Sequence, residues 1–227
     1  MDQCFHHLNQ WFKTNQGERL SHYIGVTLAL VLKDLSGKTL LQLGIEEHNA
    51  WLSSSPINKK VICLPFQGKQ KPSVIASMYQ LPFDSGSMDV IFCPFFFNAL
   101  LHKHSLFSEI DRVLTPHGHV IICGLNPFSW WGLPSVSHQP LQGLGPVRAH
   151  VLRKSLYNLG YSVDDVHRFV YWPPFIKHIF FERLFEKMGQ MILPSPAGFY
   201  LLSAQKNTFQ PLRNVTPMFY ERGISSW

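Results

Sequence analysis

Charged residues are scarce in this chain of 227 residues: they make up 15%, against about 25% in a typical globular domain. Hydrophobic residues make up 45%, so the chain can bury a substantial core and is not expected to be disordered. No apolar run reaches the roughly 20 residues that span a bilayer, and residues 1–10 lack the charged-then-apolar pattern of a signal peptide. We therefore expect a cytoplasmic protein.

Several classes of site also lack their motifs. The cysteines show no CxxC spacing, which argues against a zinc ribbon, and Cys63, Cys93 and Cys123 fall in apolar runs where buried thiols are expected. His102 and His104 are two apart and have no cysteine or acid at ligand spacing, so no metal site is expected. No GxSxG segment indicates a serine hydrolase. The net charge of +6 is scattered without a basic tract, so nucleic acid is not the expected partner.

Short, continuous apolar runs rich in β-branched residues recur along the chain, which is typical of strands covered on both faces. They predict strands at residues 39–43, 60–64, 73–77, 89–93, 119–123, 161–163 and 198–204. The spacing of apolar residues predicts helices at 4–35, with a break at Gly17, and at 98–114, 148–159 and 173–191. Alternating strands and helices predict a parallel, doubly wound α/β sheet, whose ligands bind at the carboxyl ends of the strands.

The domain organisation follows from this pattern. We expect a single domain over residues 1–206, including the N-terminal helices, and an irregular tail over 207–227. Residues 126–146, rich in Gly, Pro, Ser and Trp, are expected to form a long loop, and loops of this length are usually functional or disordered. Asp89 opens its strand, so it should anchor the turn at the edge of the sheet away from the ligand.

Two segments carry a family resemblance. Residues 81–91 read LPFDSGSMDVI, and the helix after them ends at residues 112–118 in RVLTPHG. In this order and spacing they resemble the LPF–FDVV and RVLKPGG segments of class I S-adenosylmethionine (SAM) dependent methyltransferases. LQLG at 41–44 and NPFSWWGL at 126–133 are similar to small members of the UbiE-like (type 11) branch. The resemblance implies a Rossmann-like sheet of seven strands, mostly parallel with an antiparallel last strand.

The same resemblance implies a cofactor, SAM, and the residues that hold it. The implied set is Gln42 and Gly44 after the first strand, Ser77 and Met78 after the third, and Pro94 and Phe95 at the end of the fourth. Here the family's DxGxGxG loop keeps one glycine, with Glu46 and His48 at the other glycine positions. Leu64 or Pro65 stands where an acid grips the ribose, and Ser77 stands where an acid reads the adenine. Two lost hydrogen bonds of about 1 kcal/mol each weaken binding by roughly thirtyfold.

These features predict an enzyme that transfers a methyl group from SAM to a small, apolar or lipid-like acceptor. The alternative is a methyltransferase-like binding module that has lost SAM binding. The expected substrate-binding residues are Asn126, Trp130 and Trp172, which place aromatic rings near the carboxyl edge of the sheet. The aromatic segment 169–191, which carries scattered lysines and arginines, is most simply a helix that covers the edge of the sheet. The alternative is an amphipathic lid facing an apolar substrate or a membrane interface. Tyr23, His48 and His102 are possible bases if the acceptor needs one, but the sequence assigns none of them and gives no oligomeric state.

Overall fold

The architecture was analysed in a computed structural model of the chain. The structure describes residues 2–45, 51–53, 55–65, 74–95, 103–133, 141, 146–176, 179–192 and 197–207. The predicted tail over 207–227 lies outside the described residues except for Asn207.

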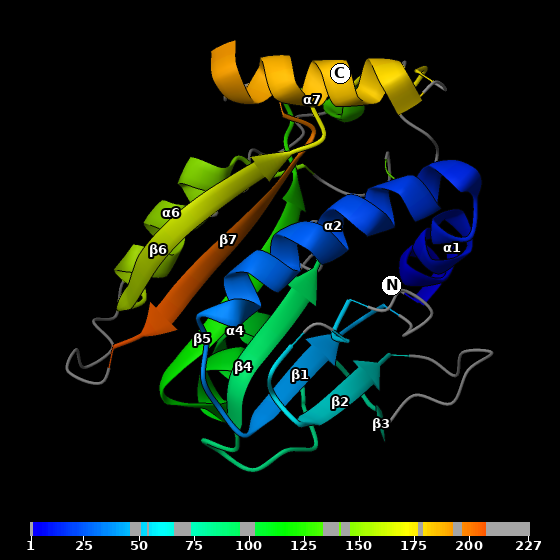
Figure 1. Cartoon of the computed structure of the whole chain (residues 1–227). Helices are drawn as coiled ribbons and strands as arrows, with labels where there is room; N and C mark the ends of the chain where they lie inside the picture. The colour runs from blue at the N-terminus through cyan, green and yellow to red at the C-terminus, as the bar shows by residue number, and fades with distance from the viewer. Residues whose placement is uncertain are drawn as a thin grey trace, which may run out of the picture.

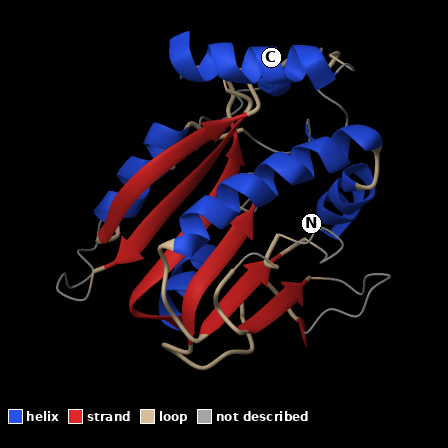
Figure 2. Cartoon of the chain, in the orientation of Figure 1, coloured by secondary structure: helices blue, strands red, loops and turns tan. Residues whose placement is uncertain are grey.

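A single seven-stranded sheet in the order β3-β2-β1-β4-β5-β7-β6 organises the fold (Figures 1 and 2). The strands are β1 (Thr39–Leu43), β2 (Lys59–Leu64), β3 (Val74–Ile75), β4 (Met88–Pro94), β5 (Leu114–Leu125), β6 (Tyr161–Phe169) and β7 (Phe199–Lys206). The first five are parallel, and β7 runs antiparallel between β5 and β6. The predicted α/β class, the central position of β1 and the antiparallel last strand are confirmed.

Helices cover both faces of this sheet. The described helices are α1 (Asp2–Phe12), α2 (Asn15–Lys33), α4 (Lys103–Val113), α6 (Ala149–Asn158) and α7 (Ile179–Ile192), with a 3-10 turn, η1, at Trp130–Gly132. α1 and α2 lie on one face, α4 and α6 lie on the other, and α7 lies across the carboxyl edge of the parallel strands (Figure 1). Among the described helices, none combines the length and apolar character needed to cross a bilayer.

The core accordingly has two halves. On the α2 side, Leu20, Ile24 and Leu28 pack on the sheet with a group of tryptophans and phenylalanines. On the other side, Leu152 and Leu156 of α6 belong to the second half of the core. The alternation of β1 between these halves places Leu41 and Leu43 towards the second half and leaves the Gln42 side chain facing α1 and α2.

Several element boundaries differ from the sequence prediction, and β5, predicted over 119–123, spans Leu114–Leu125. The helix break lies at residues 13–14, because Thr14 caps α2 by accepting a hydrogen bond from Gly17 N. Gly17 instead sits in the first turn, where a Cβ would come within 2.2 Å of the Trp11 carbonyl oxygen. β6 runs on to Phe169 past an irregularity between Val163 and Val166, which had interrupted its apolar pattern. α7 begins at Ile179 rather than at 173.

Asp89 anchors the edge of the sheet opposite the helix α7. Its Oδ2 accepts hydrogen bonds from the backbone N–H groups of Lys38 (2.7 Å) and Thr39 (3.0 Å) and from the Thr39 hydroxyl (3.1 Å). Its Oδ1 accepts from Thr115 at 3.3 Å, where residues 115–118 bulge out of β5. Burial opposes ionisation of Asp89, but these bonds lower its pKa on balance. The expected role of Asp89 as the anchor of this edge is borne out by these contacts.

Replacement of Asp89 by alanine is expected to lower the free energy of unfolding by about 2 kcal/mol, since hydrogen bonds to a charged group stabilise by roughly 1.5–3 kcal/mol. Urea denaturation at neutral pH measures the loss. Asp165→Ala, which removes an exposed carboxylate from β6, is the matched control and should leave the midpoint almost unchanged. Equal midpoints for the two variants would contradict the anchoring role.

Candidate functional site

The chain leaves β1 in a turn at Gly44 that requires a positive φ. Gly44 is buried, has a φ of 85°, and donates its N–H to the Cys63 carbonyl at 2.9 Å. Only glycine adopts this backbone conformation without strain. Gln42 braces the turn from inside, since its Nε2 donates to the Ile45 carbonyl at 2.8 Å. The Oε1 of Gln42 is buried and has no hydrogen-bond partner among the residues that the structure describes. The turn therefore carries an acceptor beside a backbone that a ligand can approach.

The end of β4 lies beside this turn, because Gln42 and Phe92 are register partners in adjacent strands. Pro94 ends the strand, and Phe95 follows with a φ of 55°. A phenylalanine in the left-handed region is uncommon, and such strain concentrates at functional sites. The Phe95 ring is fully buried and packs against Phe12 and Phe199. Phe95 thus shapes the edge through its backbone while its ring belongs to the core.

Ser77 and Met78, predicted on the cofactor side, follow β3. Ser77 is exposed, and its hydroxyl accepts a hydrogen bond from Tyr79 N at 3.3 Å. Met78 is buried and belongs to the half of the core that α4 covers. The structure therefore offers the Ser77 hydroxyl, but not an acid, at the position expected to read an adenine.

The two segments that carried the resemblance are joined by hydrogen bonds. Arg112 donates to the carbonyls of Leu81 and Phe83, each at 2.9 Å, and forms an ion pair with Glu109 at 2.8 Å. Glu109 in turn accepts from Leu81 N at 2.8 Å. The bond to Arg112 is the main reason that the pKa of Glu109 lies below its usual range. The LPF turn therefore depends on the end of α4 for its shape.

This pairing predicts how stability depends on pH. Because folding lowers the pKa of Glu109, its contribution is present above the unfolded pKa of about 4.3 and is lost as the pH falls through the folded value. Glu109→Gln should therefore unfold more easily than the wild type at pH 7, and the gap should narrow towards pH 3. Thermal unfolding followed by circular dichroism across this range measures the gap. A gap independent of pH would show that the Glu109 charge does not hold the turn.

Asn126 begins the loop after β5 and ties it to the start of β7. Its Nδ2 donates to the Ala197 carbonyl at 2.9 Å, and its Oδ1 accepts from Phe128 N at 3.1 Å. Trp130 is 47% exposed and meets the Phe175 ring edge-on at 6.1 Å. Of the predicted substrate-binding residues, Asn126 and Trp130 therefore lie at the carboxyl edge and are accessible to a ligand.

Trp172, in contrast, is fully buried. Its ring packs edge-on against Trp131 at 5.0 Å, and the Arg19 guanidinium lies 4.7 Å from its ring centroid. Trp131 Nε1 donates to the Trp172 carbonyl at 2.8 Å. The expectation that Trp172 is partly open to a substrate does not fit this structure, in which its indole is part of the core below the carboxyl edge.

α7 turns its acidic side chains towards the domain and exposes several apolar ones, which is the reverse of the usual pattern of a surface helix. Glu182 is buried and forms an ion pair with Arg19 of α2. Glu186 accepts hydrogen bonds from the N–H groups of Val170 (3.1 Å) and Tyr171 (2.9 Å). Among the α7 side chains whose burial the structure describes, the apolar ones form an exposed stripe: Leu184, Phe185, Met188 and Met191 are 43%, 40%, 49% and 86% exposed. The two carboxylates of α7 therefore bind it to the domain, and this apolar stripe faces the surroundings.

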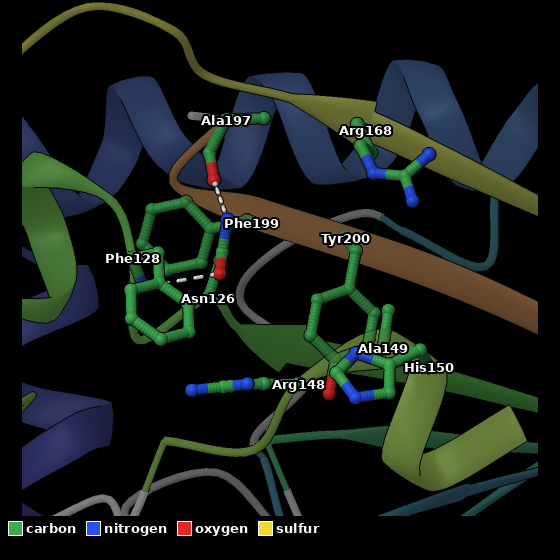
Figure 3. A pocket seen from close by; sticks show the side chains of 9 residues that line it. All are labelled: Asn126, Phe128, Arg148, Ala149, His150, Arg168, Ala197, Phe199 and Tyr200. Carbon is green, nitrogen blue, oxygen red and sulfur yellow. Dashed lines mark hydrogen bonds between the residues drawn. The ribbon is translucent and has the colours of Figure 1, made fainter. Parts of the chain in front are cut away.

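A cavity of about 280 Å³ opens beside this edge, between the start of β7 and the N-terminus of α6 (Figure 3). Its walls include Asn126, Phe128 and Tyr200, together with three basic side chains, Arg148, His150 and Arg168. Neither this cavity nor the inward carboxylates of α7 were predicted from the sequence. The only sequence signal was the spacing of Glu182 and Glu186, one helical turn apart on the side that faces the domain.

The titratable groups of the site provide no obvious base. Burial raises the pKa of Cys63 to about 11 and raises those of Cys93 and Cys123 further, so all three remain neutral thiols. Burial, reinforced by the Glu186 charge, also raises the pKa of Tyr23, which favours a hydrogen-bond donor over a base. His48 and His102, the other candidate bases, lie outside the described residues. In the described part of the chain no group of three metal-ligating side chains comes together.

Comparison with known proteins fits this geometry. Residues 53–122 match the Methyltransferase domain family. A SAM-dependent methyltransferase from Thermotoga maritima superposes with a TM-score of 0.61 at 14% identity, covering 88% of this chain and 99% of its own. One from Archaeoglobus fulgidus gives 0.59 at 15%, covering 82% and 94%. Geranyl diphosphate C-methyltransferase from Streptomyces coelicolor gives 0.55 at 14%, covering 80% and 76%. Among curated protein sequences none is significantly similar to this chain.

The strand order with its antiparallel β7 defines the class I methyltransferase fold. At 14–15% identity the solved structures show the fold alone, and the family match covers residues 53–122, which is less than half of the chain. The match and the fold together indicate a SAM-dependent methyltransferase.

Proposed function

We propose that this enzyme methylates a small apolar or lipid-like acceptor that reaches the carboxyl edge of the sheet from a membrane surface. The observation that carries the proposal is the orientation of α7, whose carboxylates point inward and whose apolar stripe points outward. A helix that only covered a sheet would show the opposite pattern. Outward apolar side chains on a helix at a ligand edge suit an interfacial contact.

Exposed aromatic side chains also lie at the carboxyl edge of the sheet, which α7 crosses. Trp130 and Phe175 are exposed as an edge-on aromatic pair, and Phe128 is 61% exposed nearby in sequence. Arg183 and Lys187 are exposed on α7 beside the stripe of Leu184 and Met188. Basic groups flanking an apolar stripe favour an anionic membrane surface.

Gln42, Gly44, Ser77 and the backbone at Pro94–Phe95 are the proposed cofactor-binding residues. The Oε1 of Gln42 can accept a hydrogen bond, and the absence of a side chain at Gly44 lets a ligand approach the backbone. When bound, SAM supplies a methyl group already activated by its sulfonium. The protein's task is then to orient the acceptor in line with that methyl group and to exclude water. No described side chain is assigned as a base.

The fold is known to serve an apolar acceptor in a related architecture. The Streptomyces coelicolor geranyl diphosphate C-methyltransferase was crystallised with geranyl-S-thiolodiphosphate and S-adenosylhomocysteine. This likeness supports an acceptor with an apolar chain without identifying it.

Radiolabelled methyl transfer tests the proposal. The wild-type enzyme is incubated with methyl-labelled SAM and a panel of prenyl, quinone and fatty-acyl compounds in vesicles, followed by extraction into organic solvent. Label is expected in at least one apolar compound and in none of the water-soluble amines, nucleosides or peptides tested alongside. Transfer confined to a water-soluble acceptor would contradict the proposed acceptor class.

A further inference from the structure

We infer that the cavity between α6 and β7 binds a phosphate or diphosphate group carried by the acceptor. This inference rests on the proposed function, because it assigns the polar end of the molecule whose apolar part is methylated. The cavity volume of about 280 Å³ lies near the lower end of the range for ligand pockets, roughly 300–1,000 Å³. It is therefore sized for a headgroup rather than for a whole lipid-like molecule.

The titratable side chains that line the cavity include two arginines and no carboxylate. Arg148 and Arg168 face the space from opposite sides, Arg148 and His150 from the start of α6 and Arg168 from β6 (Figure 3). Neither arginine forms an ion pair within the described part of the chain, and no aspartate or glutamate lines the cavity. Cations that line one cavity without a protein counter-ion favour an anion with more than one negative charge.

The Arg148 side chain is held in place by an aromatic ring. Its guanidinium lies 4.0 Å from the centroid of the Phe128 ring. A stacked guanidinium keeps its N–H groups at the rim of its plane free to donate, and phosphate oxygens accept such bonds in pairs. Tyr200 lies between the basic residues in the wall of the cavity (Figure 3). Its hydroxyl donates a hydrogen bond to the Val147 carbonyl at 2.9 Å.

The start of α6 adds donors to the same space. Arg148 occupies the N-cap position and makes no side-chain cap hydrogen bond. The N–H groups of Ala149 and His150, which line the cavity, have no acceptor among the described contacts. Free N–H groups at the start of a ten-residue helix complement an anion that the arginines already attract.

The position of the cavity fits the geometry of transfer. The proposed cofactor edge lies at β1 and β4, whereas the cavity lies at β7 and β6, two to four strands further along the sheet. At about 4.8 Å between strands, the separation is roughly 10–19 Å. An acceptor whose methylated carbon and phosphate are separated by a short apolar chain spans that distance, passing the Trp130 side of the edge.

Calorimetric titration of the full chain tests the inference without requiring activity. The ligands are geranyl diphosphate, inorganic diphosphate, geraniol and phosphatidylcholine vesicles containing phosphatidic acid. Geranyl diphosphate is expected to bind at least tenfold more tightly than geraniol or inorganic diphosphate. Arg148→Gln and Arg168→Gln should each weaken geranyl diphosphate binding about tenfold, while leaving geraniol binding unchanged. Lys33→Gln, which removes an exposed charge from the far end of α2, should have no effect.

Three results would overturn the inference. The first is wild-type affinity for geranyl diphosphate in the double arginine variant. The second is equal affinity of the wild type for geranyl and inorganic diphosphate, which indicates a site for free anions only. The third is arginine-dependent binding confined to phosphatidic acid vesicles, which indicates a lipid headgroup rather than the acceptor. Arginine-dependent geranyl diphosphate binding, with label found only in water-soluble acceptors, would instead contradict the proposed function and leave the anion site intact.

Discussion

Replacement of Gly44 by valine is expected to weaken SAM binding roughly thirty- to a hundredfold, which corresponds to about 2–3 kcal/mol. Gly44 combines a φ of 85° with burial at the end of β1. A β-branched side chain strains this backbone and places methyl groups where a ligand approaches the turn. Calorimetric titration with SAM measures the loss of affinity directly.

Gly86→Val is the matched control for this variant. Gly86 also has a positive φ, 64°, but a Cβ there meets no atom within 4 Å, and the residue lies in the turn before β4, at the opposite edge of the sheet. Both variants introduce the same side chain into a left-handed backbone, so both should lose stability. Only Gly44→Val should lose SAM affinity. Equal SAM affinities for the two variants would place the cofactor away from the β1 turn.

The double substitution Leu184→Glu with Met188→Glu is expected to abolish binding to anionic vesicles and to reduce methyl transfer to vesicle-borne acceptors at least tenfold. These residues lie one helical turn apart on the outward stripe of α7. Two carboxylates there remove apolar surface and repel an anionic membrane. Vesicle sedimentation and organic-phase label measure the two effects.

Val26→Glu with Leu30→Glu provides the control, because these side chains are also exposed and four residues apart on a helix, α2. That double variant should keep vesicle binding and transfer close to wild-type levels. SAM affinity should be unchanged in both double variants. Loss of SAM affinity in the α7 variant would show that the substitution damages the domain rather than its membrane contact.

The sequence predicted the sheet well because local patterns determine it. Continuous apolar runs marked the central strands, and the position of Asp89 at the start of β4 predicted its anchoring role. The boundary error at Gly17 arose because residue type alone does not show what a glycine packs against. Gly17 signals a break by its residue type, yet it lies inside α2 because the turn packs against the Trp11 carbonyl.

The functional edge was only partly predictable for the same reason. Trp130 and Trp172 have the same residue type and fall in similar aromatic segments, but only the packing of Trp131 and Arg19 around Trp172 makes it interior. Arg148 and Arg168 are twenty residues apart in sequence and converge because β6 folds back beside the start of α6. No spacing rule connects such residues before the topology is known.

The account depends most directly on SAM binding by the wild-type chain, because the loop after β1 keeps only one of the family's glycines. Isothermal titration with SAM and S-adenosylhomocysteine is the measurement that decides it. The predicted result is saturable one-site binding of both compounds, competitive with each other. The absence of binding of either compound to folded protein, at concentrations far above those at which methyltransferases saturate, would contradict the account and indicate a methyltransferase-like binding module.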